Sequence, residues 1–139
     1  MAIRTIRWPG EREAILDHVR LAYGPDEYEQ VASWYGALPG FDPADCFVIE
    51  GDRPGEIAAH ASLVPRVFQI GESPLPAAEV SLLSVLDAYR GRGYEGMLLE
   101  ALHQRMSERE FVLSISFGDP VLFGKWQYEY AVGLYLTSF

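Results

Sequence analysis

The amino-acid sequence predicts a mixed α/β fold, an α+β arrangement in which an antiparallel set of strands leads into a strand–helix–strand unit. Three observations indicate it. Two helical patterns follow a short first strand, three strand-like runs joined by Gly- and Pro-rich turns come next, and the clearest helical pattern then stands between two further strand-like runs. The expected order is β α α β β β α β α β, in a single domain over residues 1–139.

The first part of the chain is expected to form one strand and two helices. Residues 3–8 are strand-like and end at a Pro-Gly pair, after which residues 11–23 have a helical pattern. The apolar residues of this helix share one face: Ile15, Val19, Ala22 and Tyr23. A Gly-Pro pair ends it, and a second helix is predicted over residues 26–35 with Asp26 as its N-cap.

The middle of the chain changes to a strand pattern. Strands are predicted over residues 46–50, 57–70 and 77–86. The segments between them, residues 51–55 and 71–76, are rich in Gly and Pro and are expected to form turns. Three strands joined by short turns indicate an antiparallel meander.

The last part of the chain is expected to form a strand–helix–strand unit and a final strand. Residues 93–107 have the strongest helical pattern, and residues 111–117 alternate between apolar and polar side chains. The helix has one apolar stripe: Tyr94, Met97, Leu98, Ala101 and Leu102. The strands on either side of it should be parallel. Residues 119–126 are expected to form one or two helical turns, and residues 128–139 a strand.

The composition narrows the class of protein. Apolar residues make up 49% of the chain, which favours a packed core, and the net charge of −9 disfavours a nucleic-acid partner. No apolar run is long enough for a transmembrane helix, and the single cysteine, Cys46, cannot form an internal disulfide. We therefore expect a cytoplasmic protein with no membrane partner. His18, His60 and His103 lack metal-ligand spacing, so no metal is expected, and His60 is interpreted as a core histidine.

Residues 90–96 are the most informative stretch, because two arginines and three glycines stand there between a strand-like run and a helix. Glycine lets the backbone approach a ligand closely, and a helix start presents free N–H groups and the positive end of its dipole. The pattern predicts an anion site suited to a phosphate or pyrophosphate. A tight turn with solvated arginines is the alternative.

The motif Arg-Gly-Arg-Gly-Tyr-Glu at residues 90–95 resembles the Arg/Gln-x-x-Gly-x-Gly/Ala motif of the GNAT superfamily of acyl-CoA-dependent N-acyltransferases. A second block at residues 122–128, Leu-Phe-Gly-Lys-Trp-Gln-Tyr, resembles the Leu-Tyr-x-x-x-Gly-Phe block of that family. The resemblance covers nearly the whole chain. It implies a GNAT-like fold, with a splayed mixed sheet of about six strands and flanking helices.

The resemblance also implies acetyl-CoA as the co-substrate. Its pyrophosphate would be held at the helix start by the residues of the motif and the glycine that follows: Arg90, Gly91, Arg92, Gly93, Tyr94 and Gly96. Its pantetheine arm would pair with the main chain of the preceding strand, at Leu83, Ser84 and Val85. Leu83 and Val85 also suit a simple strand core.

Members of this family transfer the acyl group directly from the thioester to a bound amine, in a ternary complex. The resemblance assigns the oxyanion donor to the N–H of Leu83. It assigns the general base to Glu79, because a strand glutamate precedes the motif by the same spacing (90 − 79 = 11) in the histone-modifying branch. A glutamate on the solvent face of a strand end is the alternative for Glu79.

Three departures from the family pattern favour a second interpretation. Glu95 stands where the family has Gly or Ala, and Phe123 replaces the tyrosine that acts as the acid. The final strand of the family is either missing or folded back at Gly133. The alternative is a catalytically impaired acyl-CoA-binding or protein-interaction module. If the final strand is missing, the edge of the strand expected at residues 128–139 is unpaired and would suit a homodimer. The other expectation is that the chain is a domain of a longer protein.

The acceptor is expected to be a small-molecule or peptide amine, and a cationic one is favoured. The second predicted helix combines acidic with aromatic side chains: Asp26, Glu27, Tyr28, Glu29, Trp34 and Tyr35. Acidic and aromatic groups attract a cation by charge and by cation–π contact. A solvated helix face with Trp34 packed beneath it is the alternative.

Overall fold

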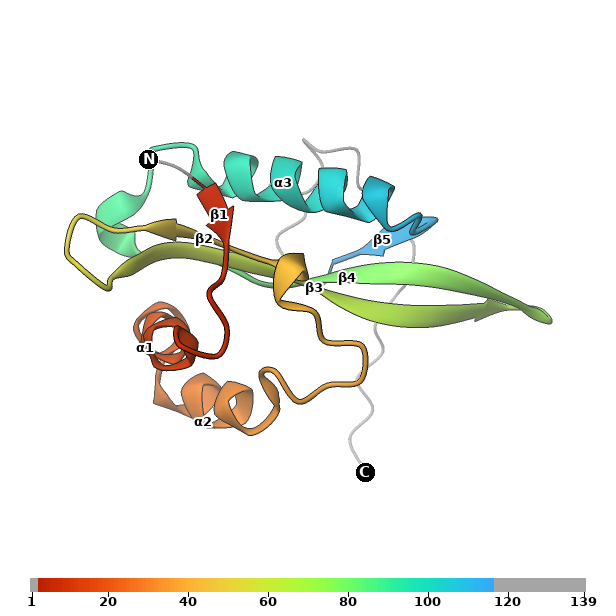
Figure 1. Cartoon of the computed structure of the whole chain (residues 1–139), viewed down its shortest axis with the longest axis horizontal. Coiled ribbons are helices and arrows are strands. Elements are labelled where there is room, and N and C mark those ends of the chain that lie inside the picture. Colours follow the sequence, from red (N-terminus) through yellow and green to blue (C-terminus); the bar gives the residue numbers. More distant parts are fainter. Residues whose placement is uncertain (1–2, 117–139) are drawn as a thin grey trace, which may run out of the picture.

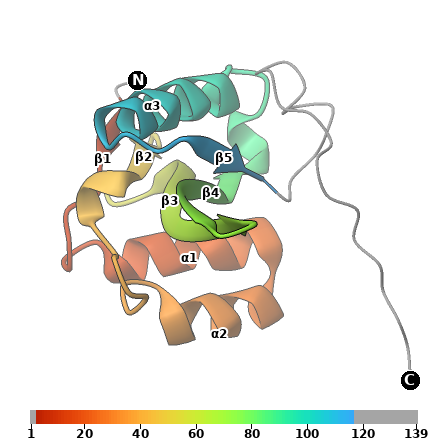
Figure 2. The same ribbon diagram turned by 90° about the vertical axis from the view of Figure 1, so that its right-hand side faces the viewer.

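The computed structural model describes residues 3–116, which form a five-stranded sheet with helices on both faces (Figure 1). The strands are β1 (Ile3–Thr5), β2 (Cys46–Glu50), β3 (Ile57–Ile70), β4 (Ser73–Val85) and β5 (Leu113–Ile115). The helices are α1 (Arg12–Tyr23), α2 (Pro25–Trp34) and α3 (Tyr94–Glu108), with short 3-10 turns η1 (Pro43–Asp45) and η2 (Asp87–Tyr89). Figure 2 shows α1 and α2 on one face and α3 on the other.

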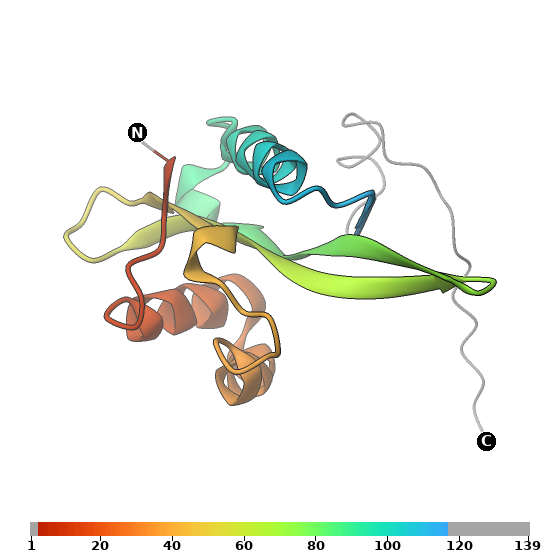
Figure 3. The same ribbon diagram turned by 45° about the vertical axis from the view of Figure 1, so that its right-hand side comes forward.

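The strands lie in the order β1-β2-β3-β4-β5, antiparallel except for the last pair. β4 and β5 are parallel, which confirms the predicted strand–helix–strand unit. β3 and β4 extend past the other strands as a two-stranded ribbon (Figure 3). The mixed α+β fold of the prediction is confirmed. The helical turns predicted at 119–126 and the strand predicted at 128–139 lie outside the described residues.

Several boundaries differ from the prediction. β1 ends at Thr5 and not at residue 8, and β5 covers only Leu113–Ile115 of the predicted strand at 111–117. β4 begins at Ser73 and not at residue 77, so Pro74 and Pro76 belong to the strand. The N–H of Val112 donates to the carbonyl of Pro76 (3.0 Å), so the main chain of Pro76 faces the β5 edge. Proline has no N–H, and at this position its absence removes no hydrogen bond to β3. α2 begins at Pro25, whose fixed φ suits a first helical position, so Asp26 lies in the first turn and is not the N-cap.

The core has one apolar cluster on each face of the sheet. On the α3 side, Leu98, Leu99 and Leu102 are fully buried against the small alanines of β3. On the other side, α1 packs on β3 and β4 and α2 packs on α1, and the buried residues of this cluster include Ile15, Val19, Val31 and Val48. No helix among residues 3–116 is both long and apolar enough to cross a membrane.

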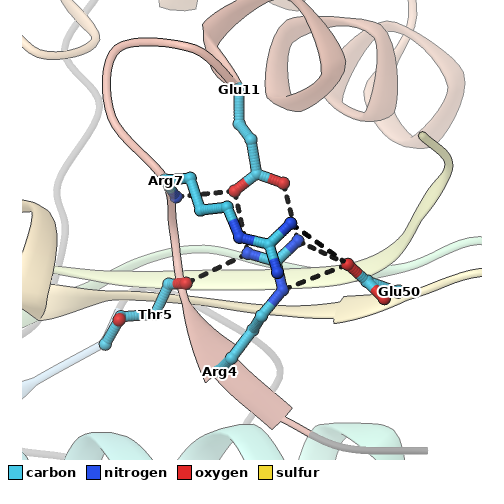
Figure 4. Close-up of polar contacts among 5 residues, drawn as sticks. All are labelled: Arg4, Thr5, Arg7, Glu11 and Glu50. Carbon is cyan, nitrogen blue, oxygen red and sulfur yellow. Dashed lines mark hydrogen bonds and ion pairs between the residues drawn. The ribbon is translucent and has the colours of Figure 1, made fainter.

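An ion-pair cluster joins β1, the start of α1 and β2 (Figure 4). The guanidinium of Arg4 donates to both carboxylate oxygens of Glu11, at 2.8 and 2.6 Å, and to Glu50 at 2.8 Å. The N–H of Arg7 also donates to Glu11 (2.6 Å). The hydrogen bond from Arg4 lowers the pKa of Glu11, so this carboxylate stabilises the fold while it is ionised.

Candidate active site

The second half of β4 has a free edge. β4 pairs with β5 only from Ala77 to Glu79, and from residue 80 onward no strand of the described part of the chain pairs with that edge. The N–H of Leu86 donates to Ala58 on β3 (2.9 Å). Because successive residues of a strand direct their main-chain groups to opposite edges, Val85 and Leu83 present theirs at the free edge. Such an edge can pair with an extended ligand.

A β-bulge interrupts β4 at this position. Ser81 is opposite Ser62 and Ser84 is opposite His60, so two residues of β4, at 82 and 83, face one residue of β3. Leu82 has φ +54°, in the left-handed region that a leucine seldom adopts. Strained backbone of this kind is concentrated at functional sites. Two adjacent leucines carry no turn or bulge signal, so sequence reasoning missed the bulge.

A buried polar network supports the bulge from the α1–α2 side. His60 contacts the carbonyl of Leu82 through Nδ1 (3.1 Å) and the hydroxyl of Tyr35 through Nε2 (2.8 Å). His18 contacts Ser84 Oγ through Nε2 (2.8 Å). His60 is fully buried, as the sequence predicted. The side chain of Ser84 therefore serves the network, and of the three residues predicted to pair with pantetheine only Leu83 and Val85 present main-chain groups at the free edge.

A glycine-rich elbow connects the free edge to α3. Gly91 and Gly93 have φ of +80° and +79°, and Gly93 is the residue before the helix. Among residues 3–116, a Cβ built on either glycine meets no atom within 4 Å. The dihedral angles require glycine, and the space above the elbow is open. The N–H groups of the first turn of α3, which contains Tyr94 and Gly96, begin there, in the arrangement that binds anions.

The two arginines of the elbow are held by neighbouring side chains. Arg90 Nε lies 2.8 Å from Asp87 Oδ1, and the guanidinium of Arg92 stands over the ring of Tyr89, 4.7 Å from its centroid. The hydroxyl of Tyr89 accepts from the N–H of Asp52 (2.7 Å) and donates to Glu56, both in the β2–β3 turn. The elbow is therefore anchored to a second loop, while both guanidinium groups remain at the surface.

Comparison with known proteins agrees with this geometry. A family model described as an acetyltransferase (GNAT) domain matches residues 2–131. The chain belongs to the GNAT acetyltransferase family. It is 35% identical over 101 residues to nodulation protein A of Sinorhizobium terangae, a match that covers 64% of this chain and 48% of that protein. The chain thus spans about half the length of this curated relative.

Solved structures share the GNAT fold. A GNAT family N-acetyltransferase from Escherichia coli, in complex with CoA, superposes with a TM-score of 0.75 at 24% identity, over 92% of this chain and 68% of that one. Glucosamine-6-phosphate N-acetyltransferase from Arabidopsis thaliana superposes with a TM-score of 0.69 at 17% identity, over 99% and 97% of the two chains. These likenesses concern the fold.

Glu79, the predicted base of this GNAT domain, lies where β4 and β5 part. It is the last β4 residue paired with β5, and its side chain is 19% exposed. Its carboxylate lies 3.4 Å from a guanidinium nitrogen of Arg66. Ala78 and Val80 pack in the α3-side core, so Glu79 faces the α1–α2 side. About 13 Å of strand separates it from Leu83, at roughly 3.3 Å per residue, so a water chain would have to link the two.

The residues predicted to attract a cationic acceptor do not form one site. Tyr35 is buried and bonded to His60, and the ring of Tyr28 faces the guanidinium of Arg20 at 6.0 Å. The acidic residues of α2 are exposed to solvent: Asp26, Glu27 and Glu29. An apolar pocket lies between the end of α2 and β3, lined by residues that include Trp34, Leu38, Phe41 and Val64. The acids and Trp34 are therefore on different surfaces.

Tyr23 is a site residue that sequence reasoning assigned only to the apolar face of α1. Its hydroxyl donates to the carbonyl of Leu83 (3.0 Å) and so reaches the free edge of β4. The residue as a whole is 42% exposed. No sequence pattern indicates this contact, because it depends on how the end of α1 packs against the bulge. Phe123 and the block at 122–128 lie outside the described residues.

Proposed function

We propose that this GNAT domain transfers an acetyl group from acetyl-CoA to an amine by direct attack in a ternary complex. The observation that carries the proposal is the continuity of the free β4 edge at Leu83 and Val85 with the open elbow at Gly91 and Gly93. An extended pantetheine arm fits such an edge, and a diphosphate fits the N–H groups and arginines that follow it.

The proposed chemistry uses few side chains. The amine nitrogen attacks the thioester carbon, and the oxygen that becomes negative is stabilised by the N–H of Leu83. Glu79 takes the proton of the attacking nitrogen through water, because it lies several residues away along β4. The C–S bond then breaks, and the thiolate of CoA leaves and is protonated.

The proposed acceptor is a cationic amine, either a small molecule or a peptide. The support is that three exposed carboxylates, Asp26, Glu27 and Glu29, lie in the first half of α2, which follows directly after the end of α1 that carries Tyr23. A net charge of −9 adds a long-range attraction for a cation. Exposed charges of this kind guide the approach of a substrate and add little to its affinity.

The test combines binding and turnover. Acetyl-CoA at 100 times its Kd should stabilise the protein by about 2.7 kcal/mol, seen as a rise in Tm. Replacing both Arg90 and Arg92 by alanine should remove most of the rise. Arg20→Ala is the matched control, because Arg20 also forms an i,i+3 pair with an aspartate but lies on α1. Release of CoA thiol is then measured against a panel of amines.

The second candidate function is that of a catalytically impaired module that binds acyl-CoA or interacts with another protein. Phe123 favours it, since phenylalanine cannot protonate a thiolate. In that case acetyl-CoA raises Tm but no amine accelerates thiol release. A homodimer through residues 128–139 also stays a proposal, which light scattering of the intact chain tests directly. No rise in Tm at millimolar acetyl-CoA would reject the transferase and the acyl-CoA-binding module, and would leave the protein-interaction module.

A further inference from the structure

We infer that His60 is a positioning residue for the oxyanion donor, acting through the peptide that joins Leu82 to Leu83. The inference rests on the proposed function, because it concerns the N–H of Leu83 as the group that meets the thioester oxygen. It goes beyond it by assigning a role to a fully buried histidine that does not reach the substrate.

The covalent geometry supplies the link between the two groups. The carbonyl of Leu82 and the N–H of Leu83 belong to one peptide unit, which is planar and places them on opposite sides. Whatever fixes the direction of the carbonyl therefore fixes the direction of the N–H. In this chain the carbonyl points into the network on the α1–α2 side, where His60 Nδ1 lies 3.1 Å from it.

The hydrogen atoms of this contact follow from its partners. A carbonyl oxygen only accepts, so Nδ1 of His60 carries a proton and donates it to Leu82. Burial lowers the pKa of His60 to about 3, so the ring is neutral and Nε2 is an acceptor. The hydroxyl of Tyr35 then donates to Nε2 over 2.8 Å. Tyr35 thereby holds His60 in the tautomer that the peptide needs.

The other hydroxyl near this carbonyl is directed elsewhere. Ser84 Oγ lies 3.2 Å from the carbonyl of Leu82 but 2.8 Å from His18 Nε2. Nδ1 of His18 faces the carbonyl of Ile57 at 2.8 Å and must donate, and burial lowers the pKa of His18 so that its Nε2 accepts. The single proton of Ser84 goes to His18, which leaves His60 as the donor that orients the Leu82 carbonyl.

This orientation matters because the bulge holds Leu82 at φ +54° without help from a glycine. A peptide at a bulge lacks a partner in the ladder, so its direction depends on contacts outside the sheet. Donation to the carbonyl also polarises the peptide and makes its N–H a better donor. An oxyanion donor that is already aimed before the reaction needs no reorganisation during it.

The experiment compares His60→Asn, His60→Leu and His60→Gln in the intact chain. Asparagine places an amide N–H at the position of Nδ1, leucine has nearly the same shape and no donor, and glutamine carries its amide one bond further out. We expect His60→Asn to retain most of kcat. His60→Leu and His60→Gln should lose on the order of 10-fold in kcat with KM for acetyl-CoA little changed, a fraction of the 10²–10³-fold cost of deleting an oxyanion donor.

Two further readouts separate positioning from a structural role. The acetyl-CoA-induced rise in Tm should be equal in all three variants. The NMR chemical shift of the Leu83 amide proton should change in His60→Leu and His60→Gln but not in His60→Asn. If His60→Leu does not fold, His60→Asn and His60→Gln carry the test. Equal kcat in His60→Asn and His60→Gln, or a loss confined to KM, overturns the inference. A wild type that releases no thiol with any amine instead rejects the acyl transfer itself, and this role with it.

Discussion

The hydroxyl of Tyr23 donates a hydrogen bond to the carbonyl of Leu83 and so brings the end of α1 to the free edge of β4. Leu83 also supplies the proposed oxyanion donor, so in the proposed reaction this phenol would stand beside the thioester. Burial raises the pKa of Tyr23, which keeps the phenol protonated near neutrality. It is therefore placed to hydrogen-bond to, or protonate, the departing thiolate.

Tyr23→Phe should lower kcat by about 10²-fold, the lower end of what general acid catalysis contributes, because CoA thiolate is a tolerable leaving group. The acetyl-CoA-induced rise in Tm should be retained. Tyr28→Phe is the control, since Tyr28 lies in the neighbouring helix with its ring facing Arg20. Steady-state thiol release measures both. An unchanged kcat in Tyr23→Phe would show that the phenol only anchors α1.

Gly93→Ala should weaken acetyl-CoA binding, because φ is +79° there and a Cβ would enter the open space above the elbow. Gly71→Ala is a matched control: φ is +61°, its Cβ also meets no described atom within 4 Å, and it lies at the tip of the β3–β4 ribbon. Both should lose about 1 kcal/mol of stability from the left-handed backbone. Only Gly93→Ala should reduce the ligand-induced rise in Tm, and equal rises would argue against diphosphate binding at the elbow.

Glu79→Gln should lower kcat by about 10²-fold and leave acetyl-CoA binding intact, because the amide cannot take the proton of the amine. Glu72→Gln, an exposed glutamate in the β3–β4 turn, should change neither. Thiol release with saturating amine is the measurement. If Glu79→Gln keeps full kcat, Glu79 serves only as the ion-pair partner of Arg66 and is not the base.

Glu11→Gln should destabilise the fold in a pH-dependent way. Arg4 lowers the pKa of Glu11 below the ordinary value of 4.5, so the ionised form is favoured in the folded state. The resulting stability is present above pH 4.5 and is lost as the pH falls through the lowered folded-state pKa. Urea denaturation should show a deficit of about 1 kcal/mol at pH 7 that shrinks in acid.

The control for this prediction is Glu13→Gln. Glu13 pairs with Arg12, and its side chain is 77% exposed, so little stability should depend on it. A deficit in Glu11→Gln that stays constant from pH 7 to pH 3 would mean that the charge of Glu11 is not the source of its contribution.

Much of this fold follows from local pattern. β2 and β3 begin and end at the predicted residues, since Gly- and Pro-rich turns bound them. In the predicted stripe of α3, Tyr94, Leu98 and Leu102 are buried, whereas Met97 and Ala101 are half-buried. The elbow was predictable for the same reason: two glycines at alternate positions before a helix have a direct conformational meaning, and both adopt positive φ.

The bulge and its support were not predictable. Leu82 adopts a conformation that its sequence neighbours do not indicate, and tertiary contacts with His60 and Tyr35 stabilise it. The sequence identified His60 as a core histidine but could not show which carbonyl it faces. These contacts join residues that are 22 to 25 positions apart, so no local window contains both partners.

The parting of β4 and β5 after Glu79 has a thermodynamic consequence. Acetyl-CoA bound along the unpaired part of β4 would act as an additional strand, and the amides of its pantetheine arm would form hydrogen bonds with successive residues of β4. Binding of acetyl-CoA would then rigidify β4, so amide protons of β4 near Val85 should exchange with solvent more slowly in the complex than in the free protein.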